Sequence, residues 1–317
     1  MESLGELLSQ MKSPQIKARS ERIIQELLGD PKVAELLALH PELDKSQLTL
    51  HLGKLHQYVK DSRNCAACPG LERCPNDFQG HYTRLTVETV TAAPQLYERK
   101  VPCAKQLAYE HETEVKNRVR SFYVDERALS EGYNVVEIMA RDMGRAPAVG
   151  QVVQYISDAR EKGLPNKGLY LVGHFGTGKT FLMSYLLHEL AEFGYTGVIV
   201  YMPEFVEELK FMMQDNQRLK EMLETMKQAD LLIFDDIGAE NLNPWVRDHI
   251  LGSILNYRMN RRPTFYTSNY DLAGLEKHLS FTSKDGEEAY KGQRLMDRIA
   301  PFVDLVPVNG SNQRRAR

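Results

Sequence analysis

The stretch Gly173-His-Phe-Gly-Thr-Gly-Lys-Thr180 fits the phosphate-binding loop pattern GxxxxGK[ST] at every fixed position. An apolar run at 168–172 precedes it and predicts a buried strand, and the apolar residues within 181–190 predict a helix after it. A strand that leads into a glycine-rich turn at a helix N-terminus points several backbone N–H groups at one spot, which suits an anion. The sequence therefore predicts a nucleoside triphosphate site in an α/β fold.

Individual residues of this loop have separate expected roles. Gly176 and Gly178 permit backbone angles and a close approach that a side chain would obstruct. Lys179 is expected to reach the β- and γ-phosphates, and Thr180 to place its hydroxyl on Mg²⁺. A chance glycine turn with a surface lysine is the alternative, which the strand–helix context disfavours. The residues expected to bind ATP and Mg²⁺ are Gly173, His174, Phe175, Gly176, Thr177, Gly178, Lys179, Thr180 and Asp235.

The composition places only loose limits on partners. With 317 residues the chain is long enough for two domains. Its formal net charge of −3 gives no overall attraction to nucleic acid, so any such binding must come from a local patch. The sequence has no run of about 18 apolar residues, so it predicts no membrane span. Its N-terminal residues are unlike a secretory signal. We expect a cytoplasmic protein that makes no membrane contact.

A second apolar run, at 231–234, ends in two carboxylates that are expected to complete the site. Asp235 is expected to hold Mg²⁺, because a hard cation needs oxygen ligands beside the phosphates. Asp236 is placed to orient and polarise the attacking water; an ordinary acidic pair at the end of a strand is the alternative. Aspartate is one methylene shorter than the glutamate that most ring ATPases use here, which favours slow hydrolysis. Glu240 is a second candidate for the base.

Polar side chains also follow the strand expected at 264–268. Asn269 is the candidate to bind the attacking water or the γ-phosphate, with Ser268 as its rival and a turn-capping role as the alternative. Farther along, Arg294 and Arg298 are four residues apart on one expected helix face. An arginine finger directed at the γ-phosphate of a neighbouring subunit is one interpretation; solvated or ion-paired arginines are the other.

All four cysteines fall in the first third of the chain. A reducing cytosol disfavours disulfides, and the spacing of Cys65, Cys68 and Cys74 predicts thiolate coordination of a structural zinc ion. Cys103 is the expected fourth ligand, with His81 as the competing one. Free thiols or a redox pair are the alternative interpretation.

The chain divides into regions of different pattern. Residues 1–107 have apolar residues at helical spacing and β-branched residues near the cysteines, which predicts a small helical domain with a strand or two. The charged residues 108–134 are expected to form a connector. In 135–317 short apolar strands alternate with helices, which predicts a parallel sheet covered on both faces, with ligand at the carboxyl ends of its strands. The expected strands are 168–172, 198–202, 231–235, 264–268 and 303–307, and the clearest helices are 179–193, 204–226 and 244–261.

Taken together, the motifs GHFGTGKT, LLIFDDIG, TSN and RLMDRI, in this order and spacing, resemble the AAA+ replicative helicase loaders of the DnaC/DnaI family over about residues 117–317. The cysteine-bearing N-terminal part resembles the helicase-binding domain of the DnaI type. The resemblance implies a three-layer αβα P-loop domain behind a small, mainly helical zinc domain. Only about ten residues follow the last expected strand, so we expect the usual helical lid domain to be absent.

The resemblance also implies roles for the motif residues. Lys179 and Thr180 match the Walker A pair, and Asp235 and Asp236 match the Walker B pair. Asn269 matches sensor 1.

Two arginine assignments follow in the same way. Arg298 matches the arginine finger, and sensor 2 falls in the C-terminal tail, on Arg314 first and Arg315 second. The implied protein binds a hexameric replicative DNA helicase and engages ATP and single-stranded DNA while the helicase is placed at an origin or a restarted fork. Its partners would include other replication-initiation proteins and further copies of the chain assembled on the helicase.

Other functions stay open. One alternative is an adaptor that ATP switches without productive hydrolysis, and another is a transposition helper ATPase. A small-molecule kinase is disfavoured because nothing in the sequence resembles an acceptor pocket. Basic and aromatic side chains can neutralise phosphates and stack bases, although buried aromatics and a solvated lysine are the simpler reading. The candidates for single-strand contact are Lys210, Phe211, Tyr201 and Phe175.

Overall fold

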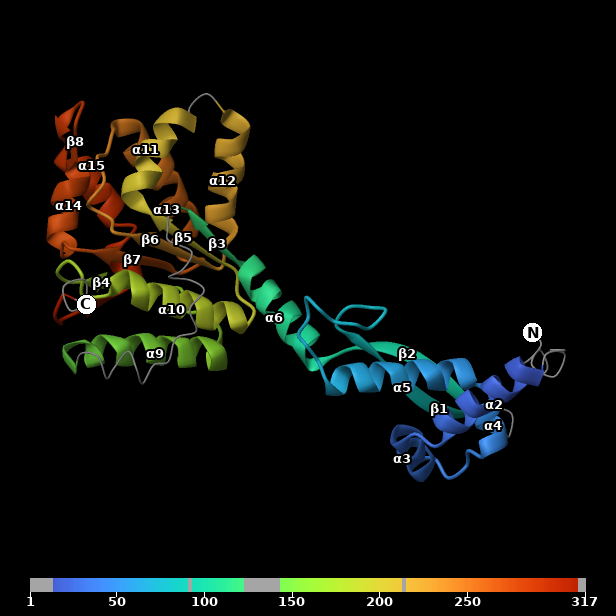
Figure 1. The fold of residues 1–317 in the computed structure, drawn as a ribbon. Coiled ribbons are helices and arrows are strands. Elements are labelled where there is room, and N and C mark those ends of the chain that lie inside the picture. The colour runs from blue at the N-terminus through green and yellow to red at the C-terminus, as the bar shows by residue number, and fades with distance from the viewer. Residues whose placement is uncertain (1–13, 91–92, 123–142, 213–214, 313–317) are drawn as a thin grey trace. The chain divides into compact units, whose positions relative to one another are not determined.

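The computed structural model describes residues 14–90, 93–122, 143–212 and 215–312 (Figure 1). The chain forms two compact units, Met1–Glu112 and Thr113–Arg317. Within the described ranges no helix has the length and apolar character needed to cross a membrane.

The described part of the first unit consists of short helices and an antiparallel hairpin. Apolar side chains from all of these elements form one core, in which Val33, Leu48 and Leu55 are fully buried. The hairpin pairs His81 with Pro102 at one end and Val90 with Ala93 at the other. The helices and strands expected near the cysteines are thus present. Their bounds are α2 (Pro14–Leu28), α3 (Pro31–Leu39), α4 (Lys45–Leu50), α5 (Leu52–Ala66), β1 (His81–Val90) and β2 (Ala93–Pro102).

A buried carboxylate ties α5 to the hairpin. Asp61 accepts hydrogen bonds from the backbone N–H of Thr83 at 2.8 Å and from its hydroxyl at 2.7 Å, and from Nζ of Lys100 at 2.9 Å. Burial alone would raise the pKa of Asp61, but the bonds from Lys100 and Thr83 outweigh it and hold that pKa below its usual value. Asp61 is therefore a charged strut between α5 and both strands.

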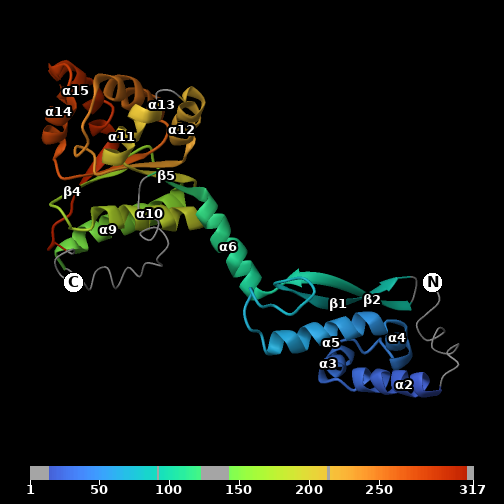
Figure 2. The ribbon, with the colours of Figure 1, turned by 45° about the horizontal axis from the view of Figure 1, so that its top comes forward.

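The second unit is built on a six-stranded parallel sheet with the order β10-β4-β7-β6-β5-β3. Helices α9 and α10 cover one face, and α11 to α15 cover the other (Figures 1 and 2). Each face has its own apolar core, as expected for strands buried on both sides. The strands are β3 (Val119–Phe122), β4 (Gly168–Val172), β5 (Gly197–Tyr201), β6 (Leu231–Asp235), β7 (Thr264–Ser268) and β10 (Val303–Pro307). The predicted α/β fold with a parallel sheet is confirmed.

Two features differ from the sequence prediction. Helix α6 (Ala104–Arg118) begins before the expected connector 108–134 and includes residues of both units, the edge strand β3 follows it within the expected connector, and residues 123–134 lie outside the described ranges. The single helix expected at 204–226 is two helices, because the side chain of Asp215 accepts a hydrogen bond from the N–H of Arg218 and begins a new helix there. A π-helix, η2, precedes α13.

The remaining elements of the second unit complete its layers. They are η1 (Met143–Arg145), α9 (Ala146–Lys162), α10 (Lys179–Glu192), α11 (Met202–Met212), α12 (Asn216–Gln228), η2 (Val246–Leu251), α13 (Gly252–Arg258), α14 (Leu272–Ser280), β8 (Phe281–Thr282), β9 (Gly286–Glu287), α15 (Ala289–Met296) and η3 (Ala300–Phe302).

Candidate nucleotide-binding site

The glycine-rich loop connects β4 to the first residue of α10, as the sequence predicts. Gly176 has φ 78° and Gly178 has φ 92°, and both values lie in the left-handed region that favours glycine. A methyl group on Gly176 would also collide with the carboxamide of Asn312. The loop therefore needs glycine at both positions for the backbone angle, and at Gly176 for space as well.

Lys179 is buried against the loop that precedes it. Its Nζ donates hydrogen bonds to the carbonyl oxygens of Gly173 at 2.9 Å and His174 at 3.0 Å, and to Oδ1 of Asn269 at 2.8 Å. Only 7% of the lysine is exposed. The ammonium group is thus held at the mouth of the loop by oxygen atoms, which are the same kind of partner that a phosphate would supply.

Asp235, the last residue of β6, faces Thr180 across the loop. Its Oδ2 accepts from the Thr180 hydroxyl at 3.0 Å, and its Oδ1 accepts from the Thr267 hydroxyl at 2.7 Å. Burial of this carboxylate raises its pKa. A hydroxyl and a buried carboxylate side by side provide the oxygen ligands that Mg²⁺ prefers. A divalent cation would also compensate the free-energy cost of burying the carboxylate charge, so the chemistry of these residues fits Mg²⁺.

Asp236 and Asn269 lie next to this pair. Asp236 has φ 55°, a left-handed conformation that costs an L-residue about 1–2 kcal/mol, although Asp tolerates it better than most. Nδ2 of Asn269 donates to Oδ1 of Asp236 at 3.0 Å, while Oδ1 of Asn269 accepts from Lys179. Ser268, the rival candidate, instead donates to the carbonyl of Ile237 at 2.6 Å. Of the two, Asn269 is therefore the one that contacts the loop lysine and the acid.

A curated relative matches this chain from end to end. The replicative helicase loader DnaI of Bacillus subtilis (strain 168) is 33% identical over 317 residues, which cover 99% of this chain and 99% of the relative. The chain belongs to the DnaI family of replicative helicase loaders. The resemblance predicted from its motifs is thereby confirmed.

Further comparisons agree with membership of the DnaI family. Residues 1–93 match the family described as primosomal protein DnaI N-terminus, and residues 164–317 match IstB-like ATP binding protein. A crystal structure of DnaI is 31% identical, with a TM-score of 0.50, and the match covers 64% of this chain and 99% of that one. The phage-like element PBSX protein XkdC of Bacillus subtilis (strain 168) is 33% identical over 129 residues, 38% of this chain and 47% of that protein. The second unit is thus an AAA+ domain of the ATP-binding type.

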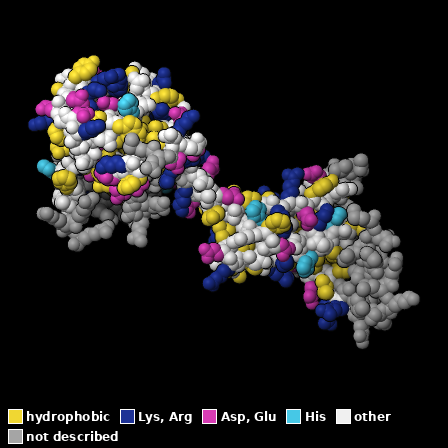
Figure 3. Space-filling view, turned by 90° about the horizontal axis from the view of Figure 1, so that it is seen from above, with side chains coloured by type: hydrophobic (Ala, Val, Ile, Leu, Met, Phe, Trp, Pro, Cys, Tyr) yellow, Lys and Arg dark blue, Asp and Glu magenta, His cyan; other side chains and the backbone are white. Residues whose placement is uncertain are grey.

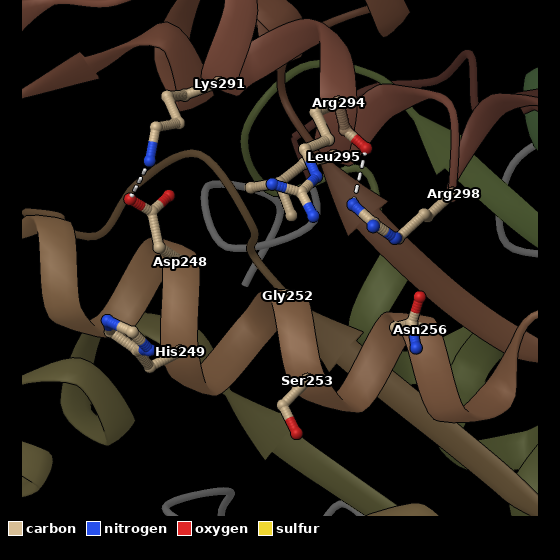
Figure 4. A pocket seen from close by; sticks show the side chains of 9 residues that line it. All are labelled: Asp248, His249, Gly252, Ser253, Asn256, Lys291, Arg294, Leu295 and Arg298. Carbon is tan, nitrogen blue, oxygen red and sulfur yellow. Dashed lines mark hydrogen bonds and ion pairs between the residues drawn. The ribbon is translucent and has the colours of Figure 1, made fainter.

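The arginine pair of this DnaI-family chain lines a separate cavity of about 440 Å³. Both guanidinium groups lie in the space between the end of α15 and the η2–α13 helix (Figure 4). Nη1 of Arg298 donates to the carbonyl of Arg294 at 2.8 Å, and its Nε is buried without a hydrogen-bond partner in the described part of the chain. No residue of the phosphate-binding loop lines the cavity. The lining residues are Asp248, His249, Gly252, Ser253, Asn256, Lys291, Arg294, Leu295 and Arg298.

Other predicted site residues lie elsewhere or outside the described ranges. Glu240 is buried, accepts from the N–H of Gly238 at 2.7 Å and contacts Nε2 of His278 at 3.2 Å, so it holds the loop after β6. Arg314 and Arg315 lie beyond residue 312, the last one described.

The candidates for single-strand contact have different surroundings. Phe211 and Phe175 are 76% and 69% exposed, whereas Tyr201 is partly buried and Lys210 is paired with Glu207 at 2.6 Å. Lys and Arg side chains are interspersed with acidic ones on the face of the second unit seen in Figure 3. The two exposed phenylalanines are therefore better placed to stack bases than the other two residues.

The zinc site expected in the first unit is not assembled. Among the residues that the structure describes, no group of three or more His, Cys, Asp or Glu side chains is arranged to hold a metal ion. The thiols and the imidazole have other partners: Asn76 donates to Cys65, Lys105 donates to Cys68, and Nδ1 of His81 contacts the carbonyl of Gln79. Burial, and to a smaller extent the charges of the nearby Cys68, Cys74 and Cys103, raise the pKa of Cys65.

Sequence reasoning missed two residues at the phosphate loop and its acids. Thr267, on β7, bonds to both acids of the Walker B pair. Arg145, buried in η1, has its guanidinium against Gly178. A signal for Thr267 is its hydroxyl within an otherwise apolar run, two residues before Asn269. Nothing local marks Arg145, because it reaches the loop from a distant segment.

Proposed function

We propose that this chain is an ATP-dependent loader that binds the hexameric replicative DNA helicase and helps to place it on single-stranded DNA, in the cytoplasm, during initiation or restart of replication. Membership of the DnaI family supports the helicase as partner. The observation that carries the ATP dependence is a set of hydrogen bonds at the carboxyl ends of the central strands. Asn269 joins Lys179 to Asp236 there, beside the bonded pair Thr180 and Asp235.

In this proposal each residue of the site has one task in ATP hydrolysis. Lys179 exchanges the carbonyl oxygens of the loop for β- and γ-phosphate oxygens. Thr180 and Asp235 would hold Mg²⁺, which when bound would neutralise part of the phosphate charge. Asp236 orients the attacking water, and Asn269 fixes Asp236 relative to Lys179. Because Asp236 is shorter than a glutamate, we expect slow turnover that rises when the protein assembles on the helicase or on DNA.

We propose that the arginine cavity acts between copies of the chain. Within the described ranges the buried Nε of Arg298 has no hydrogen-bond partner, and the cavity that Arg298 lines includes no residue of the phosphate loop; both observations support a role at the γ-phosphate of a neighbouring subunit. ATP would then bridge two loaders assembled on the helicase, and hydrolysis would loosen them. Arg314 stays the proposed sensor 2 residue.

We propose a division of labour in which residues 1–107 bind the helicase, residues 108–134 form a connector that also supplies β3 to the sheet, and residues 135–317 hydrolyse ATP. The match of residues 1–93 to the DnaI N-terminus supports this division. The test is a pull-down with purified hexameric helicase, comparing the full chain with residues 1–107. Capture of both at similar affinity supports the division; capture of the full chain alone moves the helicase contact to the second unit, and capture of neither refutes the loader.

For single-stranded DNA we propose contact through Phe211 and Phe175. Their exposure supports base stacking, which contributes about 1–3 kcal/mol per base. Fluorescence anisotropy of a labelled oligonucleotide should show weaker binding for Phe211→Ala and Phe175→Ala, with Lys210→Ala as the control. Equal affinities of the unsubstituted chain and the three variants for the oligonucleotide would show that single-stranded DNA binds elsewhere.

A structural zinc ion remains part of the proposal for the first unit. The donor set fits zinc in kind, since Cys65, Cys68, Cys74 and Cys103 are neighbouring thiols, but the sulfurs would have to move together to form a tetrahedral site. Atomic absorption on protein purified without chelator should find about one zinc per chain, and Cys68→Ser should lose it. Protein that is folded and free of zinc would exclude the site; His81→Ala tests the competing ligand.

A second candidate function is an adaptor that ATP switches without productive hydrolysis. The position of Asp236, where a longer acid is usual, favours it. Helicase loading with a non-hydrolysable ATP analogue separates the two, because a switch still loads once while a hydrolytic loader stalls. A transposition helper ATPase is the third candidate, and failure to bind any replicative helicase would favour it.

A further inference from the structure

Thr267 occupies the junction between the two acids of the candidate site. It lies on β7, next to β6, and only 1% of it is exposed. Its hydroxyl donates to Oδ1 of Asp235 at 2.7 Å and accepts from the backbone N–H of Asp236 at 2.8 Å. One oxygen atom thus binds the side chain of one acid and the backbone of the next.

The backbone of Thr267 reinforces this junction. Its carbonyl accepts from the N–H of Ile237 at 2.9 Å, so the turn Asp235–Ile237 is held to β7 at two consecutive N–H groups. That turn includes the left-handed Asp236, whose φ of 55° the strand alone would not favour. The Thr267 hydroxyl therefore fixes both the direction of the Asp235 carboxylate and the conformation that presents Asp236.

We propose that Thr267 is a positioning residue that couples the Mg²⁺ ligand Asp235 to the water-orienting Asp236. With Oδ1 held by Thr267, Oδ2 of Asp235 is left facing Thr180, and the two oxygens form the pair suited to the cation. Residues that bond to metal ligands orient them, and their loss weakens metal binding by about 10- to 100-fold. This inference rests on the proposed ATP-hydrolysing function of the same site.

Valine and serine separate the hydroxyl from the shape of the side chain. Thr267→Val keeps the branched shape in the buried strand but removes the bonds to both acids, whereas Thr267→Ser keeps the hydroxyl. Thr264→Val is a matched control, because Thr264 lies on the same strand, is also buried, and bonds to Arg258 at 3.0 Å instead of to the acids.

The experiment measures Mg²⁺-dependent binding of a fluorescent ATP analogue to the full chain, together with kcat and KM for ATP. For Thr267→Val we expect the Mg²⁺ concentration at half-maximal binding to rise by about 10- to 100-fold, while affinity in EDTA stays unchanged. We also expect kcat to fall more than KM rises, because the disturbed acids act after ATP is bound. Thr267→Ser should restore both quantities to within about threefold, and Thr264→Val should change neither.

The outcomes are separable. Unchanged Mg²⁺ dependence in Thr267→Val, an equal shift in Thr264→Val, or no recovery in Thr267→Ser would each overturn the role of Thr267 while leaving the ATPase proposal intact. Failure of the unsubstituted chain to bind the analogue with Mg²⁺ would remove the proposed function, and the role of Thr267 with it. Circular dichroism at the assay temperature confirms that each variant is folded.

Discussion

Asp61 in the first unit and Asp235 in the second are both buried carboxylates, but their partners differ. Asp61 is bonded to the ammonium group of Lys100 at 2.9 Å, and its pKa lies below the usual value. Asp235 accepts from two neutral hydroxyls, and burial raises its pKa although Lys179 acts in the opposite direction. A buried acid that a lysine neutralises stabilises a fold, whereas one bonded only to neutral donors has room for a cation. We therefore propose that Asp61 stabilises the first unit, whereas Asp235 of the second unit serves a ligand.

The largest expected effect falls on turnover in the second unit. Arg298→Ala should lower the hydrolysis rate stimulated by helicase and single-stranded DNA by about 1000-fold, because an arginine finger stabilises charge that develops on the transferred phosphate. Affinity for ATP, measured by calorimetry, should stay nearly the same, because no residue of the phosphate-binding loop lines the cavity around Arg298.

Arg294→Ala is the matched variant, since Arg294 lines the same cavity one helical turn away. A larger loss there than in Arg298→Ala would reassign the finger to Arg294. Loss of ATP binding in Arg298→Ala would instead show that the arginine acts within its own subunit.

The next effect belongs to the first unit. Asp61→Asn should destabilise it by about 3 kcal/mol, because Lys100 loses its buried partner. Urea unfolding followed by circular dichroism should register the loss. Trp245, the one tryptophan of the sequence, lies in the second unit. Its fluorescence should therefore report an unfolding transition with an unchanged midpoint. A shift of the Trp245 transition would mean that the units do not unfold independently.

This contribution of Asp61 has a definite pH dependence. Its folded pKa lies below the unfolded value of about 3.9, so the unfolded chain binds the proton more readily in acid. The stabilisation is therefore complete well above pH 4 and is lost as the pH falls through the folded pKa. The difference in free energy of unfolding between the unsubstituted chain and Asp61→Asn should shrink over that acid range. A constant difference would show that the ion pair between Asp61 and Lys100 does not stabilise the first unit.

A smaller effect is expected for the loop lysine. Lys179→Ala should weaken MgATP binding by about 100-fold, which corresponds to the loss of one or two hydrogen bonds between charged groups. Lys210→Ala, which removes a surface lysine paired with Glu207, should bind like the unsubstituted chain. Similar calorimetric affinities for Lys179→Ala and the unsubstituted chain would refute the assignment of the phosphate site.

The smallest effect completes the comparison of the two acids. Asp235→Asn should change the free energy of unfolding of the second unit by less than about 1 kcal/mol, because removing an incompletely compensated buried charge offsets the altered bonds to Thr180 and Thr267. The Trp245 transition measures it directly. A loss as large as that of Asp61→Asn would show that Asp235 is a stabilising strut and would erase the contrast between the units.

Sequence reasoning reached the parts of the site that local pattern determines. Lys179 and Thr180 follow from a loop whose geometry is set within eight residues, and Asp235 and Asn269 follow from apolar strands that end in polar residues. Thr267 could not be assigned, because its two bonds depend on the pairing of β6 with β7, which is a non-local property. Strand β3 was missed because Val119-Arg-Ser-Phe122 is short, lies at an edge and carries polar residues in its centre.

The first unit was harder to predict for the same physical reason. Its helices and hairpin follow from periodicity, but the strut between Asp61, Thr83 and Lys100 joins residues that are far apart in sequence. The spacing of the cysteines predicts the chemistry of a metal site but does not determine whether the sulfurs converge.

The contact between Asn312 and Gly176 has a practical consequence for preparing the protein. Asn312 therefore lies beside the loop that would receive the triphosphate. A bulky fluorescent label attached through an Asn312→Cys substitution would occupy space next to Gly176 and would distort nucleotide titrations. Labels for such titrations therefore belong on residues that do not border the loop.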